Sequence, residues 1–230
     1  LDALNAWQLV RELKTAIGLP AGLQGVFFSI SNVLIQSTIN SFGKIEIAGS
    51  AVSSNIEGFM YVSMNSIYQA AITFTSQNVG AHQYRRIRKI CFTTVMVVSA
   101  IGLALGSIAM LFRHQLISIY NQDPEVMKRA VVRLEIFAAT YFTCGVMDVL
   151  CGMLRGLGST IIPMIVSLLG ACAFRIFWIY CILPFDRTPF MLYFSYPVSW
   201  VLTSAIHFLC YLHLLKRFPV EPEKLSAVKA

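Results

Sequence analysis

The sequence carries little charge for its length. Of its 230 residues only 13% are charged and only 11 are acidic, whereas 57% are hydrophobic. Soluble domains have about 25% charged and about 45–50% apolar residues, and the mean hydropathy here is +0.67. These values exclude an ordinary soluble domain and predict an integral membrane protein.

Motifs for metal, nucleic-acid or catalytic chemistry are missing. The six cysteines all fall within apolar stretches, and none belongs to a CxxC pair or to a Cys/His cluster at zinc spacing. The net charge of +7 comes without the aromatic-studded basic patch of a nucleic-acid-binding protein. No His/Glu metal motif, aspartate pair or Ser/His pair lines up along the chain. We therefore expect no metal, no cofactor, no nucleic-acid partner and no enzymatic activity, and we interpret the cysteines as reduced packing residues.

Long apolar segments are abundant. Six of them lie at about residues 17–40, 45–79, 90–112, 126–154, 160–183 and 189–215. About 20 mostly apolar residues span a bilayer as a helix, and only helices and closed barrels satisfy the backbone there. The pattern predicts an all-α, six-helix membrane bundle over residues 17–217, surrounded by the lipid bilayer.

The two ends of the chain are short and polar. Residues 1–16 form an amphipathic stretch without the basic-then-apolar order of a signal peptide. It also lacks an initiator methionine, so we expect a cytoplasmic linker that continues from something longer, and residues 218–230 form a tail. Eleven Lys and Arg residues lie on the side of the termini and six on the other, with Arg175 inside a span. This excess predicts a multi-pass protein of the inner (cell) membrane with both termini in the cytoplasm.

The link between the third and fourth segments contains a helix start signal. It reads RHQLISIYNQDPEV, a short amphipathic turn followed by Asp-Pro-Glu at 123–125. Aspartate before proline, with glutamate next, is typical of a helix N-terminus. The fourth helix is then longer than a bilayer requires. We expect its first turns to protrude and to place Arg129, Arg133 and Glu135 in water or among lipid headgroups.

Four of the six segments carry polar residues at helical spacing. In the second segment they are Glu57, Tyr61, Asn65, Tyr68, Gln69, Thr73, Ser76 and Gln77. The other stripes are Gln24, Asn32, Gln36 and Asn40; Thr140, Cys144, Asp148 and Cys151; and Ser195, Ser199, Thr203, His207 and Tyr211. Polar side chains within lipid face protein or water. The stripes predict a shared polar interior, in which the hydroxyl groups and the histidine also serve as hydrogen-bonding glue between helices.

Two carboxylates, Glu57 and Asp148, lie near the middle of their helices. A carboxylate at that depth costs about 2.5–3.5 kcal/mol on insertion scales, so we expect each to have a partner or to serve ion or proton traffic. Arg175 is the obvious counter-charge, and either a salt bridge or contact with headgroups would explain it. Pro20 near the start of the first segment, and prolines at or inside later ones, also suggest the broken helices of some transporters.

Three motifs mark the ends of these segments. They are IGLPAGLQ at the entry to the first, AAITFTSQNVGAHQYRRIRK across the end of the second, and GMLRGLGSTIIPM between the fourth and fifth. In these motifs the chain resembles the multidrug and toxic compound extrusion (MATE) transporters, in particular the bacterial branch that includes DinF-like proteins. The resemblance covers essentially the whole chain. It implies the C-terminal lobe of a two-lobe, twelve-helix transporter, whose partner is the N-terminal six-helix lobe of the same protein.

The resemblance also implies roles for individual residues. Those that match family motifs would be structural, at helix ends and tight cytoplasmic turns: Pro20, Gln77, Asn78, Gly80, Ala81, Arg155 and Gly156. Some relatives use acidic residues of this lobe for sodium, but Phe28 and Cys144 stand at those positions, so we expect that site to be absent. Family members export cationic amphipathic drugs in exchange for protons or sodium.

We therefore expect a secondary transporter that exports small organic cations and amphipathic compounds, with H+ or Na+ as the coupling ion. Glu57 and Asp148 would supply negative potential to the pathway. The rest of the lining would come from the polar stripes, from Arg175 and from four apolar or aromatic side chains, Phe27, Phe28, Tyr61 and Met64. Two alternatives are a lipid-linked oligosaccharide flippase of the same superfamily, which would need a more basic cleft, and a six-span oligomeric channel.

Overall fold

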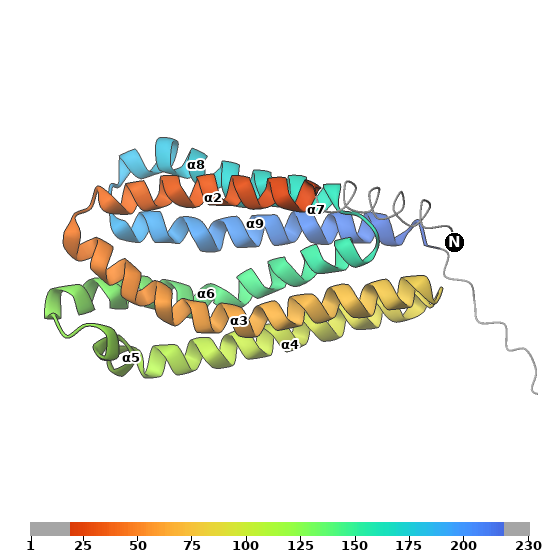
Figure 1. Ribbon diagram of the computed structural model, residues 1–230, viewed down its shortest axis with the longest axis horizontal. Coiled ribbons are helices and arrows are strands. Elements are labelled where there is room, and N and C mark those ends of the chain that lie inside the picture. The colour runs from red at the N-terminus through yellow and green to blue at the C-terminus, as the bar shows by residue number, and fades with distance from the viewer. Residues whose placement is uncertain (1–18, 219–230) are drawn as a thin grey trace, which may run out of the picture.

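The computed structural model describes residues 19–218, which form a helical bundle (Figure 1). Its long helices are α2 (Leu19–Asn40), α3 (Lys44–Gly80), α4 (Tyr84–Leu111), α6 (Pro124–Gly156) and α9 (Pro189–Leu215). A composite helix covers Ile161–Phe185, and the short α5 (Arg113–Tyr120) precedes α6. These helices lie where the sequence places its six segments, with the largest difference at the start of α4. The predicted linker 1–16 and the tail beyond Phe218 lie outside the described residues.

Length and composition agree with a membrane bundle. Four helices, α4, α6, Ile161–Phe185 and α9, are each long and apolar enough to cross a bilayer. The helices α2, with 22 residues, and α3, with 37, are also long enough for a hydrocarbon core of about 30 Å. The predicted all-α membrane fold is confirmed.

The central helix of the bundle is α6, which packs against α3, α4 and α9. Figure 1 shows it between the layer of α2 and α9 and the layer of α3 and α4. Two glycines of α4 let that helix approach closely, because a Cβ on Gly106 would lie 2.1 Å from the carbonyl oxygen of Ala138, and one on Gly102 would lie 2.8 Å from Phe142 Cα. Small residues four apart are typical of tight helix contacts in membranes.

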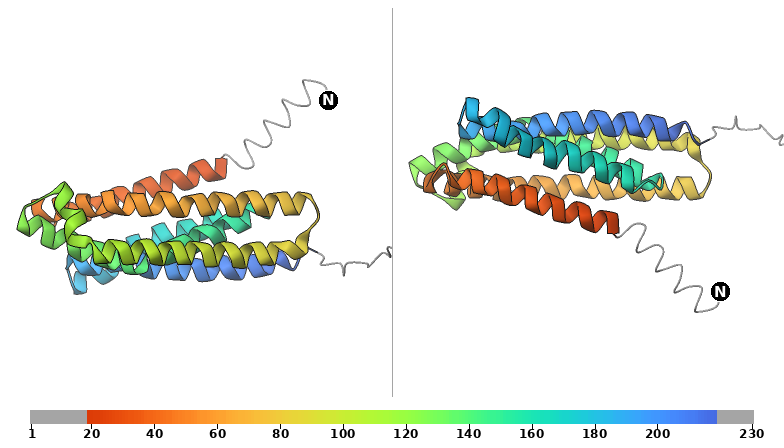
Figure 2. Two further views of the ribbon diagram at one scale, coloured as in Figure 1. Left: turned by 90° about the horizontal axis from the view of Figure 1, so that it is seen from below. Right: turned by 90° about the horizontal axis from the view of Figure 1, so that it is seen from above.

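The bundle has two different edges. Both views of Figure 2 show α2 and α3 toward one edge and α4 and α9 toward the opposite edge. The outward side chains of α4 are large and apolar, for example Phe92, Leu103 and Leu111, which are 68%, 51% and 72% exposed. The edge formed by α4 and α9 therefore suits acyl chains.

The turns follow the predicted signals. Asp123 caps α6 by accepting a hydrogen bond from the Glu125 backbone N–H at 2.9 Å, and Pro124 is the first helical residue. A short turn connects Gly80, the last residue of α3, to α4, and His82 there adopts a positive φ of 56°. The helix start predicted at residues 123–125 is confirmed.

The composite fifth helix differs from the predicted proline-broken helices. Its α-helical pieces, α7 (Ile161–Ser167) and α8 (Phe174–Phe177), alternate with the π-helical segments η2 (Leu168–Ala173) and η3 (Trp178–Ile182), and it ends in the 3-10 turn η4 (Leu183–Phe185). Neither π segment contains a proline. Pro197, in contrast, lies inside α9 without interrupting it, and Pro189 is at its start. The helix irregularity is therefore in the fifth segment, and its two π segments themselves contain no proline.

The stripe of α9 faces the interior, as the sequence predicts. Its members, Ser195, Ser199, Thr203, His207 and Tyr211, are all buried. The three hydroxyl groups of Ser195, Ser199 and Thr203 donate to carbonyl oxygens of their own helix at 2.6–2.8 Å. All six cysteines are free thiols, four of them buried.

Candidate functional site

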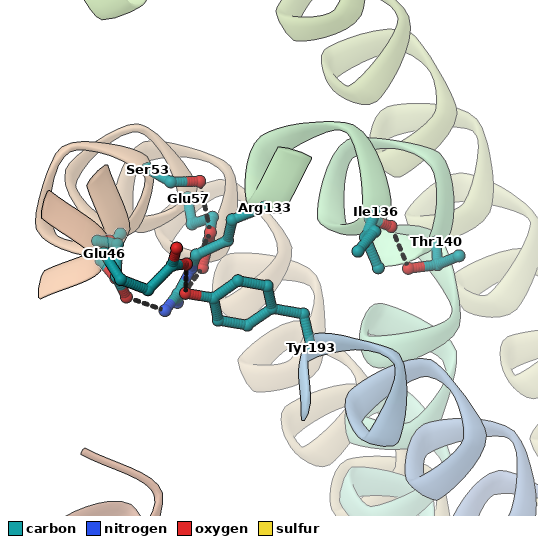
Figure 3. Close-up of polar contacts among 9 residues, drawn as sticks. Glu46, Ser53, Glu57, Arg133, Ile136, Thr140 and Tyr193 are labelled. Carbon is teal, nitrogen blue, oxygen red and sulfur yellow. Dashed lines mark hydrogen bonds and ion pairs between the residues drawn. The ribbon is translucent and has the colours of Figure 1, made fainter. Parts of the chain in front are cut away.

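A buried ion pair joins α3 and α6 (Figure 3), at the end of the bundle far from Leu19 and Phe218. The Arg133 guanidinium donates through Nε to Glu57 Oε1 and through Nη2 to Glu57 Oε2, both at 2.9 Å. Its Nη1 donates to Ser50 Oγ at 2.6 Å, and Ser53 Oγ donates to Glu57 Oε1 at 2.8 Å. Arg133 and Glu57 are 7% and 6% exposed. Each charge is therefore neutralised within the protein.

Aromatic side chains close around this pair. The Arg133 guanidinium lies over the rings of Phe137 and Tyr193, at 4.8 and 5.2 Å from their centroids. Tyr193 of α9 in turn donates its hydroxyl to Glu46 at 2.6 Å, and Arg129 forms a longer ion pair with Glu46, at 3.7 Å. Three helices, α3, α6 and α9, are thus held together at this end.

The prediction that Arg133 lies in water or headgroups is wrong. It fails because the prediction used only distance from the start of α6, whereas the partner, Glu57, lies 76 residues away in sequence. Arg129 and Glu135 are more exposed, and Glu135 pairs with Arg113 at 3.1 Å. The sequence did contain a signal for this pair. Glu57 lies about 20 Å from the start of α3, and Arg133 lies about 14 Å from the start of α6. Both helices start on the same side of the predicted membrane, so the two side chains lie at similar depths.

Arg175 makes neither of its two expected contacts. It is 5% exposed and therefore does not reach headgroups. It donates through Nε to Ser199 Oγ at 2.9 Å and lies 4.0 Å over the ring of Tyr196. Within residues 19–218 it forms no salt bridge with Glu57 or Asp148. Its charge is instead stabilised by a hydroxyl and by an aromatic face, so both alternatives, the salt bridge and the headgroup contact, are wrong.

Asp148, unlike Glu57, has no ion-pair partner among the described residues. It is half-buried on α6 and makes no side-chain hydrogen bond or ion pair within residues 19–218. Tyr61 and Tyr68 of α3 lie close enough to interact with it electrostatically. Arg155, seven residues later on α6, is a cation that interacts with it electrostatically. Asp148 therefore has no direct partner among residues 19–218.

Arg155 connects three helices at the end near the termini. Its Nη1 donates to the Tyr68 hydroxyl of α3 at 2.5 Å, and its Nη2 donates to Gln24 Oε1 of α2 at 2.6 Å. The residue lies in the last turn of α6 and is half-buried. Beside it, Gly156 allows close packing, because a Cβ there would lie 2.5 Å from Thr75 Cβ. The motif residue expected in a tight turn thus also holds α2 and α3 to α6.

The outward face of α3 is polar along most of its length. We define this polar face as the exposed or half-exposed residues Ser54, Asn55, Gly58, Asn65, Ser66, Gln69, Thr73, Ser76 and Gln77, beside which the apolar side chains of Phe59, Val62 and Phe74 are also exposed. The hydroxyls of Ser66 and Thr73 donate to carbonyl oxygens of their own helix. The amides of Asn55, Asn65 and Gln69 make no side-chain hydrogen bond within residues 19–218. A side chain of that kind is costly against acyl chains.

The predicted α3 stripe therefore does not lie on one face. Residues four apart advance by about 40° because a turn holds 3.6 residues. Glu57 at one end is consequently buried against α6, Tyr61 is 43% exposed, and Gln69 and Thr73 are exposed. Met64 is 2% exposed and lies in the core near Gly145, so its assignment to an open lining is wrong.

The first-helix candidates divide between two environments. Asn32 and Gln36 are exposed, and Gln36 donates to Asn40 at 3.1 Å. Phe27 is 43% exposed, whereas Gln24 and Phe28 are half-buried. Ser31, Ile35 and Ile39 form the buried face of α2. The structure thus brings Gln24 together with the α3 and α6 residues through Arg155, and leaves Asn32 and Gln36 outward.

The motif at the end of α3 occupies the helix terminus. Gln77 and Ala81 are exposed, the Ala81 backbone N–H donates to the Gln77 carbonyl oxygen at 2.9 Å, and Asn78 donates its amide to the Phe74 carbonyl oxygen at 2.8 Å. Gly80 ends the helix with open space around it. Pro20 lies in the first turn of α2.

Comparison with known proteins identifies the family to which this chain belongs. The family model MatE matches residues 20–181. The chain belongs to the MatE family. Among curated relatives, the probable multidrug resistance protein YoeA of Bacillus subtilis is 22% identical over 68% of this chain and 34% of its own length. The multidrug resistance protein MdtK of Photorhabdus laumondii is 26% identical over 69% of this chain and 34% of its own length. These relatives are transporters, not enzymes.

Solved MATE structures share the fold. The Vibrio cholerae transporter VcmN in its bent form has a TM-score of 0.82, is 20% identical, and is matched over 94% of this chain and 49% of its own. A transporter from Pyrococcus furiosus, described as having a binding pocket of reverse polarity that suggests a different function, has a TM-score of 0.82, 14% identity, and coverage of 92% and 48%. This chain thus spans about a third of the curated relatives it matches and about half of the solved structures.

Proposed function

We propose that this chain forms one lobe of a two-lobe secondary transporter that exports amphipathic organic cations in exchange for protons or sodium. The observation that carries the proposal is the polar face of α3. Its unpaired amides at Asn55, Asn65 and Gln69 do not suit acyl chains, and in a membrane such groups face protein or a water-filled cavity. A second polar-lined lobe opposite α2 and α3 would supply both the protein surface and the water-filled cavity that these groups require.

The lengths of the relatives support this arrangement. The solved MATE structures are about twice as long as this chain and share its fold. The partner in our proposal is the N-terminal six-helix lobe of the same protein, which would lie against the edge of α2 and α3 in Figure 2. The opposite, apolar edge would face lipid. By the positive-inside rule, the basic cluster at 82–89 supports an inner-membrane protein with both termini in the cytoplasm.

Asp148 is the carboxylate best suited to attract a cation in this lobe. Glu57 is already paired with Arg133 through two hydrogen bonds of 2.9 Å, so its charge is neutralised within the lobe. Asp148 is half-buried, unpaired within the described residues, and next to Tyr61, whose ring is partly exposed. An aromatic ring beside a carboxylate offers an organic cation both an apolar face and an opposite charge.

The proposal is tested by Asp148→Asn in the complete protein. The substitution keeps the side chain's size and removes its charge. We expect cation export into everted vesicles to fall about tenfold, as for loss of one charge-assisted contact, at unchanged protein level. Asp186→Asn, which removes an exposed carboxylate from a loop, is the matched control. Driving export in separate experiments with a proton gradient and with a sodium gradient identifies the coupling ion.

Two results would count against this assignment. Unchanged export by Asp148→Asn would remove the residue from the pathway, and an equal loss with Asp186→Asn would indicate a general charge effect. The flippase alternative requires a basic cleft, but on the described α2, α3 and α6 surface Arg155 is already bonded to Tyr68 and Gln24. No observation in this lobe favours that alternative over export.

A further inference from the structure

A groove with a volume of about 780 Å³ runs between α4 and α9, on the edge opposite α2. Phe92, Val95 and Met96 of α4 line one wall, Phe208 and Leu212 of α9 line the other, and Leu150 of α6 lies at its base. This volume falls in the range of sites that bind small amphiphilic molecules. The groove belongs to the apolar edge of the lobe, away from the polar face of α3.

One end of the groove is basic. Arg88 near the start of α4 and Lys216 directly after α9 both line it, and both are exposed. None of the described residues that line the groove is acidic. The two cations therefore meet any ligand in the groove without a competing carboxylate.

The apolar part extends away from this basic end to a definite depth. Met96 lies eight residues beyond Arg88, which is about 12 Å along a helix, and Ser204 lies twelve residues before Lys216, which is about 18 Å. Half of a hydrocarbon core is about 15 Å. The groove thus matches one leaflet of a bilayer, with its charges at the headgroup level.

We propose that this groove binds an anionic phospholipid of the leaflet on the side of the termini. Its phosphate lies between Arg88 and Lys216, and an acyl chain lies along Phe92, Met96 and Phe208. Basic pockets between membrane helices are suited to anionic headgroups, and the apolar walls hold the chain that a free phosphate lacks. This inference rests only on the lobe's being embedded in a membrane, and not on the proposed export.

Charge complementarity with Arg88 and Lys216 favours an anionic lipid as the occupant of the groove. A zwitterionic lipid would place its own cation near Arg88 and Lys216 and gain less from them. A second copy of the chain would have to present an acidic edge, whereas the described residues of α4 contain no Asp or Glu and those of α9 contain none either. An organic cation would be repelled by the same two side chains.

Native mass spectrometry of the complete protein tests the proposal, with phosphatidylglycerol and phosphatidylcholine of identical acyl chains as probes. We expect the wild-type protein to retain phosphatidylglycerol preferentially. The double variant Arg88→Gln/Lys216→Gln should weaken its apparent binding by about 30-fold and leave phosphatidylcholine unchanged. The control Arg86→Gln/Lys89→Gln removes two charges from the same cluster outside the groove and should change binding by less than about twofold.

A second pair of variants tests the apolar wall. Ala205→Phe fills the groove without changing charge, and Ala104→Phe adds the same bulk at an exposed position of α4 outside it. Loss of phosphatidylglycerol from Ala205→Phe alone supports the proposal. Equal retention of the two lipids by the wild-type protein, equal losses in the two charge variants, or a dimer that forms in place of lipid binding would each overturn it.

Discussion

Removing Arg133 should destabilise the lobe strongly, and removing both members of its ion pair should not. The change Arg133→Leu leaves the Glu57 carboxylate buried, with the Ser53 hydroxyl as its remaining hydrogen-bond donor in the cluster. Breaking a buried pair on one side costs about 3–5 kcal/mol, because an uncompensated charge remains. Leucine also gives up the stacking of the guanidinium on Phe137 and Tyr193.

The double variant Glu57→Leu/Arg133→Leu separates the two explanations. Replacing a buried ion pair by apolar residues of similar volume is often neutral or stabilising. We therefore expect the single variants to melt at a clearly lower temperature than the wild-type protein, and the double variant to recover most of the loss. Thermal unfolding of the purified complete protein, followed by size-exclusion chromatography, measures both.

The half-exposed pair between Arg113 and Glu135 is the matched control. Its side chains are 36% and 42% exposed, so Arg113→Gln should cost only about 0.2–1 kcal/mol. If Arg133→Leu melts like the wild-type protein, or if the double variant is as unstable as the singles, the reasoning is refuted. If Glu57→Gln abolishes export in a protein of normal stability, Glu57 acts in ion traffic and not in structure.

Two further substitutions test the packing of α6. Gly106→Val should lower stability by about 1–3 kcal/mol because its side chain would meet the Ala138 backbone, whereas Gly58→Ala, which has open space around it, should change the melting temperature little. Arg155→Gln should release α2, because the contacts to Tyr68 and Gln24 are lost; faster amide hydrogen exchange in α2, with α9 unchanged, is the expected result, and uniform exchange would contradict it.

The helices were predictable because apolar length is a local property of the sequence. Each segment is long enough to span a bilayer on its own, and the α6 start follows from one aspartate and one proline at 123–124. These features need no knowledge of neighbouring helices. The α9 stripe was also predicted correctly, because all five of its residues are buried.

Pairing between helices was not predictable by the same reasoning. Arg133 was interpreted from its position near the start of α6, and Arg175 was expected to contact either an acidic residue or lipid headgroups, neither of which it does. Which of two mid-helix cations meets Glu57 depends on the rotation of α3 against α6, which single-sequence periodicity does not set. Comparing depths along helices that enter from one side would have favoured Arg133.

The α3 stripe shows a second reason for error. A run of polar residues was treated as one surface, although its spacing drifts around the helix. As a result Glu57 was grouped with Gln69, while the structure buries the first and exposes the second. The π segments on either side of Arg175 contain no proline, so the proline signal did not locate them.

Water accessibility of the polar face of α3 tests the central claim most directly. In a complete protein with Cys181→Ser and Cys210→Ser, a charged maleimide is reacted in open membranes with Gln69→Cys and, separately, with Leu103→Cys on the apolar edge. Because only the thiolate reacts and it forms in water, we expect Gln69→Cys to be labelled readily and Leu103→Cys to be protected. Protection of both positions, or faster labelling at position 103, would contradict a water-filled cleft beside α3.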